Sequence, residues 1–116
     1  MKSDVMRIYI SGKVSGKEQG QFFSDFDNAE VLLRRKYPDA EIINPVAMTA
    51  GIAMNCPSFS HKEYLDLCIC ALDKCTHIFL MDDWNHSTGA MEEVEYALKC
   101  NHKILTSADM KVGNDQ

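Results

Sequence analysis

The chain has 116 residues and a formal net charge of −5, a length typical of one domain that can bury an apolar core without disulfides or metals. Because affinity for nucleic acid comes from clustered Lys and Arg, the negative charge argues against a nucleic-acid partner. The five cysteines form no Cys-x-x-Cys pair and no apolar run approaches ~18 residues, so we expect a cytoplasmic protein without disulfides, zinc or a membrane span.

The N-terminal half predicts two strands and at least one helix. Residues 6–10 form a short β-rich run, too short for a signal peptide, that ends in a loop over residues 11–16. Apolar side chains recur near helical spacing over residues 19–37, where a Tyr-Pro pair stops the helix. Residues 41–45 are a brief second strand. Residues 46–58 are rich in small residues, Met and Pro without a clear period, and are expected to form a loop or a partial helix.

The C-terminal half continues the alternation of helices and strands. A Ser-x-x-Glu capping box that begins at Ser60 predicts a helix reaching residue 75. Residues 76–81 are the third strand, residues 88–100 the next helix, and residues 103–105 a fourth short strand. This order predicts βαβ units, and therefore a mainly parallel sheet with right-handed crossovers.

The predicted fold class is α/β, a three-layer flavodoxin-like or Rossmann-like fold with a short, mainly parallel sheet. Residues 1–107 are expected to form this single domain, and residues 108–116 a polar, frayed tail. In open α/β sheets a ligand binds beyond the carboxyl ends of the strands, beside helix N-termini. The candidate site residues are therefore sought in the turns after the first and third strands.

Those two turns carry small, hydroxyl-bearing and basic residues, which are Ser11, Gly12 and Lys13 in the first and Ser87, Gly89 and Ala90 in the second. Backbone N–H groups and a lysine ammonium in the first turn suit a phosphate or a sugar hydroxyl, although a simple tight turn explains the same residues. In the second turn the hydroxyl can cap the next helix, and the small residues let a ligand approach the backbone. Neither turn has the spacing of a P-loop or of a dinucleotide-binding loop.

Glu93 lies in the first turns of the helix that follows residue 87, where the helix dipole is expected to favour its ionised form. It is either a carboxylate nucleophile or an ordinary helix-start acid. Tyr9 either aims its hydroxyl into the crevice or packs under the first helix. Trp84, the only tryptophan, either walls a planar base or belongs to an interface. The four histidines show no ligand spacing, so neither a metal site nor a cofactor is predicted.

Three motifs together resemble a small bacterial and phage family related to nucleoside 2-deoxyribosyltransferases. They are Ile-Tyr-Ile-Ser-Gly at residues 8–12, Asn-Pro at residues 44–45, and Trp-x-x-Ser-x-Gly-Ala-x-x-Glu-x-x-x-Ala over residues 84–97. The resemblance spans roughly residues 6–105. The chain is also similar, more distantly, to the 2'-deoxynucleoside 5'-phosphate N-hydrolases, which share the flavodoxin-like fold and cleave the bond between base and deoxyribose.

By this resemblance Glu93 is the nucleophile that forms a glycosyl-enzyme ester, and Tyr9 is the tyrosine that positions it. Ser87 falls where the transferases carry an aspartate that contacts the sugar 5'-hydroxyl and the hydrolases a serine that contacts a 5'-phosphate. Serine suits the phosphate better, because an aspartate would repel it. Cys68 stands where these enzymes carry an aspartate that assists proton transfer to the leaving base. Relatives complete their sites with a neighbouring subunit, which implies a homo-oligomer, a dimer or larger.

The sequence thus leads to an N-hydrolase or a deoxyribosyltransferase acting on (deoxy)nucleosides or nucleoside 5'-monophosphates through Glu93. The alternative is a non-catalytic nucleotide-binding module that kept the phosphate and sugar cradle and lost the acid at Cys68. A third hypothesis is a structural or interaction protein with a vestigial crevice. Asp82, Asp83 and Glu92 are candidate replacements for the missing acid, whereas nearby Asp66 falls on the wrong helical face.

Overall fold

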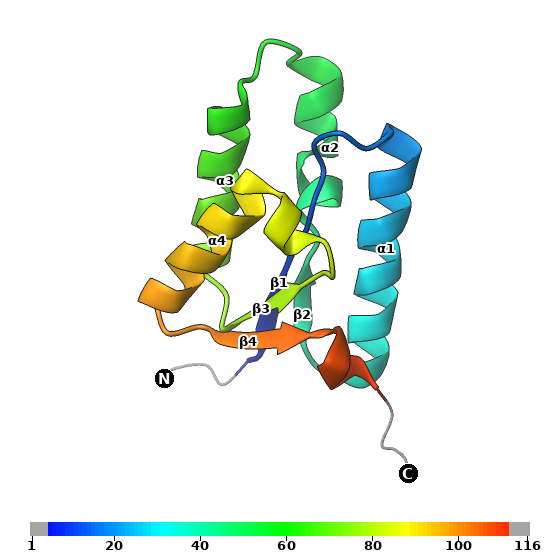
Figure 1. Cartoon of the computed structure of the whole chain (residues 1–116), viewed down its shortest axis with the longest axis vertical. Helices are drawn as coiled ribbons and strands as arrows, with labels where there is room; N and C mark the ends of the chain where they lie inside the picture. The colour runs from blue at the N-terminus through cyan, green and yellow to red at the C-terminus, as the bar shows by residue number, and fades with distance from the viewer. Residues whose placement is uncertain (1–4, 112–116) are drawn as a thin grey trace.

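The computed structural model describes residues 5–111, which form a layered α/β domain (Figure 1). Residues 1–4 and 112–116, the start of the predicted domain and most of the predicted tail, lie outside the described residues. The described residues form ten elements: β1 (Arg7–Ser11), α1 (Gln19–Lys36), β2 (Glu41–Ile43), α2 (Pro45–Asn55), α3 (His61–Asp73), β3 (His77–Leu80), the 3₁₀ helix η1 (Trp84–His86), α4 (Thr88–Lys99), β4 (Lys103–Thr106) and the 3₁₀ helix η2 (Ser107–Met110).

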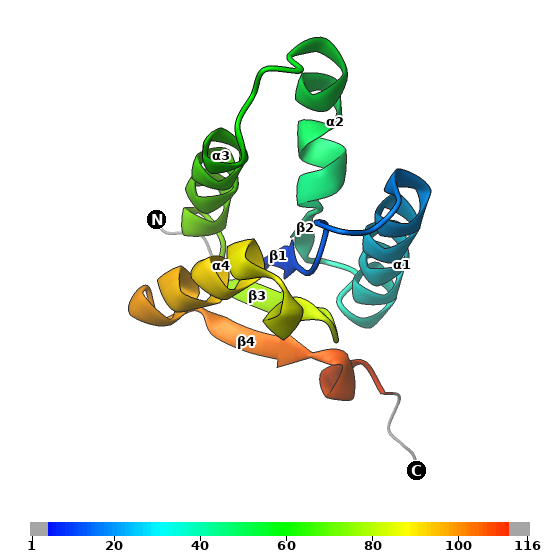
Figure 2. The same ribbon diagram turned by 45° about the horizontal axis from the view of Figure 1, so that its top comes forward.

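The four strands make one parallel sheet in the order β2-β1-β3-β4. Its central strands are β1 and β3, in a register that pairs Tyr9 with Ile78. Helix α1 lies on one side of the sheet and helices α3 and α4 on the other (Figures 1 and 2). This arrangement confirms the predicted fold class, a three-layer α/β domain with a short parallel sheet.

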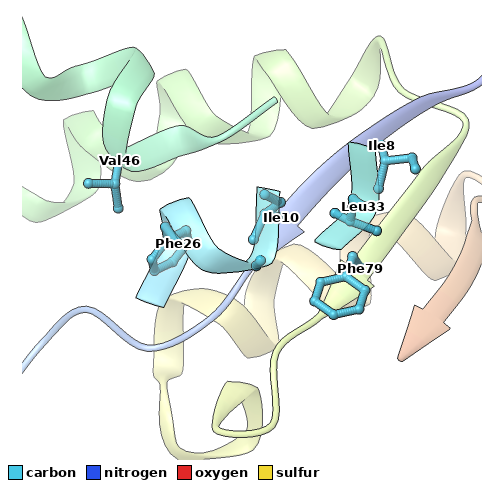
Figure 3. Packing of buried hydrophobic residues seen from close by; sticks show 7 residues of the cluster. Ile8, Ile10, Phe26, Leu33, Val46 and Phe79 are labelled. Carbon is cyan, nitrogen blue, oxygen red and sulfur yellow. The ribbon is translucent and has the colours of Figure 1, made fainter. Parts of the chain in front are cut away.

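Two hydrophobic clusters hold the layers together, because successive side chains of a strand point to opposite faces of the sheet. Ile8 and Ile10 of β1 pack with Phe26 and Leu33 of α1 in the first cluster (Figure 3). Tyr9, between them in sequence, belongs to the second cluster, which the sheet forms with α3 and α4. The alternation therefore turns Tyr9 toward the face where α4 packs.

Of the two alternatives expected over residues 46–58, a loop or a partial helix, the structure has the helix, because α2 covers residues 45–55. Asn44 caps it, accepting hydrogen bonds from the backbone N–H groups of Val46 at 3.1 Å and Ala47 at 3.2 Å, and Pro45 takes the first helical position, where its fixed φ suits a helix. The helix shows little amphipathic periodicity because its exposed side also carries apolar side chains such as Met48 and Met54. Periodicity alone could therefore not decide between a loop and a helix here.

The remaining boundaries are close to those predicted from the sequence. The capping box of α3 forms, with the Ser60 hydroxyl accepting from the Glu63 N–H and the Glu63 carboxylate accepting from the Ser60 N–H. The predicted tail begins in an ordered turn, because Asp109 of η2 accepts a 2.8 Å hydrogen bond from the Thr106 N–H. No helix within residues 5–111 is long and apolar enough to cross a membrane.

Candidate active site

A cavity of about 280 Å³ opens at the carboxyl end of β1, between α1, α2, α3 and the start of α4. Figure 2 shows α2 and α3 standing apart above the sheet, with α1 beside α2. The walls are mainly apolar and include Phe22 and Phe23, whose rings stack 5.5 Å apart. Val46 and Ala50 of α2 and Leu65 of α3 continue the walls. The cavity lies where open α/β sheets bind their ligands.

Glu93 of α4 adjoins this cavity and is 8% exposed. The Tyr9 hydroxyl donates a 2.7 Å hydrogen bond to Glu93 Oε2, and the Ser11 hydroxyl donates a 2.7 Å hydrogen bond to Glu93 Oε1. Tyr9 and Ser11 reach the same carboxylate because they are two residues apart on β1 and so share one face of the sheet. Both are fully buried, so the orientation of Glu93 is set by the central strand.

The burial of Glu93 is the main cause of its shifted pKa. Desolvation raises the pKa of Glu93 from 4.5 to about 6, while the hydrogen bonds from Tyr9 and Ser11 lower it and the nearby Glu92 raises it. The net direction is opposite to the one expected from the helix dipole, because loss of water outweighs both hydrogen bonds. Burial and the Glu93 charge also raise the pKa of Tyr9 well above 10, which keeps its hydroxyl a donor.

Cys68 lines the cavity beside this pair. Burial raises the pKa of its thiol to about 11, although a hydrogen bond with Tyr9 acts in the opposite direction. The thiol is therefore protonated and neutral near pH 7. It is a weak proton donor to a leaving group compared with a carboxylic acid.

The candidate replacement acids do not reach the cavity. Asp82 accepts a 2.8 Å hydrogen bond from the Ser107 hydroxyl, and Asp83 binds Lys17 and the loop after β1. Glu92 is exposed. Asp66 pairs with Lys62 on the exposed face of α3, as its helical position predicted. Within residues 5–111, Glu93 is the only carboxylate that lines the cavity.

The turn before α4 contributes the predicted small residues. Ser87 caps α4 by accepting a 3.1 Å hydrogen bond from the Ala90 N–H, and Ser87, Gly89 and Ala90 all line the cavity together with Glu93. Gly12 also lines it. A Cβ at Gly12 would lie 2.5 Å from Met81 Sδ, so the close approach of the two loops requires glycine there.

Three predicted ligand-binding residues take other places. Ser11 is buried beneath Glu93, where its hydroxyl donates to the carboxylate, and it does not line the cavity. Lys13 points its ammonium at the His86 carbonyl, 3.2 Å away, and its backbone N–H at Asp83. Trp84 packs against the cluster between the sheet and α3 and α4. Neither Lys13 nor Trp84 lines the cavity.

The structure also brings in residues that sequence reasoning did not single out, chiefly the aromatic pair of α1, the inner side of α2, and His61 and Tyr64 of α3. The sequence did contain a signal for His61 and Tyr64. His61, Tyr64, Leu65 and Cys68 follow the i, i+3, i+4, i+7 spacing of one helical face, and by the resemblance Cys68 already stood at the position of an active-site acid. No group of three or more His, Cys, Asp or Glu side chains within residues 5–111 is arranged to hold a metal ion.

The fold and the site define a small Rossmann-like α/β domain with a ligand-sized cavity over a buried carboxylate. Residues 6–106 match the model of the family described as a domain of unknown function, DUF4406, and the chain belongs to this family. The family is related in general to nucleoside 2-deoxyribosyltransferase-like proteins. No curated protein matches the chain.

Proposed function

We propose that the protein binds a nucleoside or a nucleoside 5'-monophosphate in this cavity and breaks its N-glycosidic bond with Glu93 as the nucleophile. The observation that carries the proposal is a buried carboxylate at the cavity wall whose two oxygens each accept a hydrogen bond, from Tyr9 and from Ser11. Two fixed donors hold the carboxylate in one orientation, as covalent catalysis needs. With a pKa of about 6, Glu93 is mostly ionised at neutral pH.

In the proposed reaction a Glu93 oxygen bonds to the anomeric carbon while the bond from that carbon to the base nitrogen breaks. The electron pair of the broken bond leaves with the base, which takes up a proton. Water then releases the sugar from the ester in a hydrolase, or a second base releases it in a transferase. The general relation of the family to nucleoside 2-deoxyribosyltransferase-like proteins is what suggests this chemistry.

The rest of the cavity suits the two ends of such a ligand. The stacked rings of Phe22 and Phe23 offer an apolar surface for a planar base. The first turn of α4, at Thr88 and Gly89, offers backbone N–H groups, which lack intrahelical partners at the start of a helix and favour an anion. The cavity of about 280 Å³ is at the low end of small-molecule sites, which favours a mononucleotide over a dinucleotide. Assembly into a homo-oligomer remains part of the proposal.

The test is a panel of nucleosides and nucleoside monophosphates incubated with the protein, with free base measured by chromatography. The wild type is expected to release base, and Glu93→Gln is expected to release none because an amide cannot form the ester. Glu95→Gln is the matched control, since Glu95 lies on the same helix and is exposed. Unchanged release by the Glu93 variant contradicts the proposal.

A second function is favoured by Cys68, the neutral thiol in the position of a general acid. A cavity that holds a nucleotide without an acid for the leaving base would serve as a nucleotide-binding module. Calorimetric binding of a nucleoside monophosphate, with no base released over long incubation, would support this alternative over the enzyme.

A further inference from the structure

The loop that leads from β1 to the start of α1 (Figure 1) supplies two residues of the cavity wall, Val14 and Ser15. Residues 14–17 form a tight turn, closed by a 3.2 Å hydrogen bond from the Lys17 N–H to the Val14 carbonyl. Gly16 is the third residue of this turn and has a φ of +83°, which glycine adopts without strain. The turn therefore has a defined shape, and its position over the cavity must come from contacts outside it.

Asp83, in the segment after β3, makes those contacts with both ends of the turn. Its Oδ1 accepts a 3.1 Å hydrogen bond from the Lys13 N–H, directly before the turn, and its Oδ2 pairs with the ammonium of Lys17, at the end of the turn. Lys17 Nζ also lies 2.9 Å from Asp25 Oδ2 of α1. The side chains of Lys17, Asp25 and Asp83 are 21%, 24% and 27% exposed, so water and salt screen these charges less than they screen a fully exposed pair.

The segment that carries Asp83 also leads to the start of α4, where Ser87 and Gly89 line the same cavity. Lys13 Nζ adds a further link between the two segments, a 3.2 Å hydrogen bond to the His86 carbonyl. The loop after β1 and the segment before α4 are thus joined into one unit. Both oxygens of the Asp83 carboxylate take part in the joint.

The carboxylate of Glu93 is held in a different way. Its two hydrogen bonds come from Tyr9 and Ser11, which belong to the strand β1 and not to the loop. A change in the position of the loop therefore alters the cavity wall and leaves the orientation of Glu93 in place.

We infer that Asp83 is a positioning residue, which holds the loop after β1 in place as a wall of the cavity and thereby sets how tightly the cavity binds its ligand. That the ligand is a nucleotide rests on the proposed function. A wall that is already in place loses little conformational freedom when the ligand arrives. Without Asp83 the loop occupies other positions as well, and the affinity falls with the fraction of molecules that are ready to bind.

Limited digestion with trypsin tests the position of the loop without a ligand. Trypsin cleaves after lysine, and the bond after Lys13 becomes accessible when the loop moves away. Asp83→Ala and Lys17→Met are expected to speed this cleavage about tenfold, because each removes a hydrogen bond to a charged group. Lys17→Arg keeps the charge and should keep the loop protected. Asp82→Ala is the matched control, since Asp82 is exposed and bonds to Ser107.

Kinetics of base release from the four deoxynucleoside 5'-monophosphates tests the effect on the ligand. Asp83→Ala and Lys17→Met are expected to raise KM about tenfold and to keep kcat within about twofold, because the loop contributes to binding and the strand holds Glu93. A merely destabilised protein would instead lose active molecules, which lowers kcat and leaves KM unchanged. That result would overturn the inference.

Calorimetry with the same monophosphates separates this inference from the proposed function. If the wild type binds a monophosphate and releases no base, the proposed reaction fails, and a Kd weakened about tenfold in both variants still supports the inference. If base is released and neither the cleavage after Lys13 nor KM changes in the variants, the proposed function stands and the inference is overturned. It is also overturned if cleavage is faster but KM and Kd are unchanged, if the wild type binds no monophosphate, or if Asp82→Ala has the same effects as Asp83→Ala.

Discussion

Replacing Glu93 by glutamine is expected to stabilise the protein at neutral pH. The folded protein raises the pKa of Glu93 from 4.5 to about 6, so the folded state holds the Glu93 proton more tightly than the unfolded state does. Stability from this group is therefore fully present below pH 4.5 and is lost as the pH rises to about 6. By linkage the loss amounts to roughly 2 kcal/mol. Glutamine has the same shape and no charge to desolvate.

The structure lets glutamine keep the local hydrogen bonds. The hydroxyls of Tyr9 and Ser11 now both donate to the carboxylate, and one of them can turn to accept from the amide nitrogen. The variant is therefore expected to exceed the wild type in unfolding free energy by up to about 2 kcal/mol at pH 7 to 8. Below about pH 4.5 the wild-type carboxyl is itself neutral, and the difference should vanish.

Urea unfolding of the wild type, Glu93→Gln and Glu95→Gln across this pH range measures the effect. The exposed Glu95 is the control, and its variant should follow the wild-type curve. A Glu93 variant no more stable than the wild type at pH 7, or a gain of the same size at low pH, would refute the argument that desolvation dominates at Glu93. The assay needs no ligand, so it tests the carboxylate independently of the proposed reaction.

Three further changes probe the site. Tyr9→Phe removes one donor to Glu93, the proposed nucleophile, and is expected to raise the pKa of that carboxylate by about one unit. The acid limb of the pH profile for base release should therefore move upward, and an unmoved limb would contradict the proposed role of Glu93. Gly12→Ala places a Cβ 2.5 Å from Met81 Sδ and should cost about 1–3 kcal/mol in thermal unfolding, whereas Gly20→Ala, with nothing within 4 Å, should not destabilise. If the protein is an enzyme limited by a missing acid, Cys68→Asp should raise the rate of base release ~10²–10⁴-fold. If the protein only binds nucleotides, the same variant should lower the melting temperature and release no additional base.

The sequence predicted the four strands and three of the four α-helices because their apolar residues follow a clear period or a capping motif. Residues 46–58 show no such period, since α2 has apolar residues on its exposed side as well as against the cavity. The local signal was Asn44 before a proline, an N-cap followed by a residue suited to the first helical position. Periodicity measures burial of one face and does not detect a helix with two apolar faces.

For the site, the sequence could bring the turns after β1 and β3 together, because parallel strands end at one edge of the sheet, whereas the pairing of Tyr9 with Glu93 came from the family resemblance. It could not place Trp84 or Lys13, whose positions depend on the 3₁₀ turn before α4 and on hydrogen bonds to Asp83 and to the His86 carbonyl. The direction of the Glu93 pKa shift could not be predicted from the sequence either. A helix dipole can be inferred from the sequence, whereas desolvation follows from packing between layers.

The energetics of Glu93 favour a chemical role over a structural one. A buried carboxylate with a raised pKa lowers stability at neutral pH by roughly 2 kcal/mol, and an uncharged side chain in its place would avoid that loss. The two donors that hold it, Tyr9 and Ser11, offset only part of the desolvation. Strained or costly groups of this kind are retained where activity needs them. Because the carboxylate borders the cavity and no other carboxylate within residues 5–111 does, this cost supports the proposal that Glu93 reacts with a ligand.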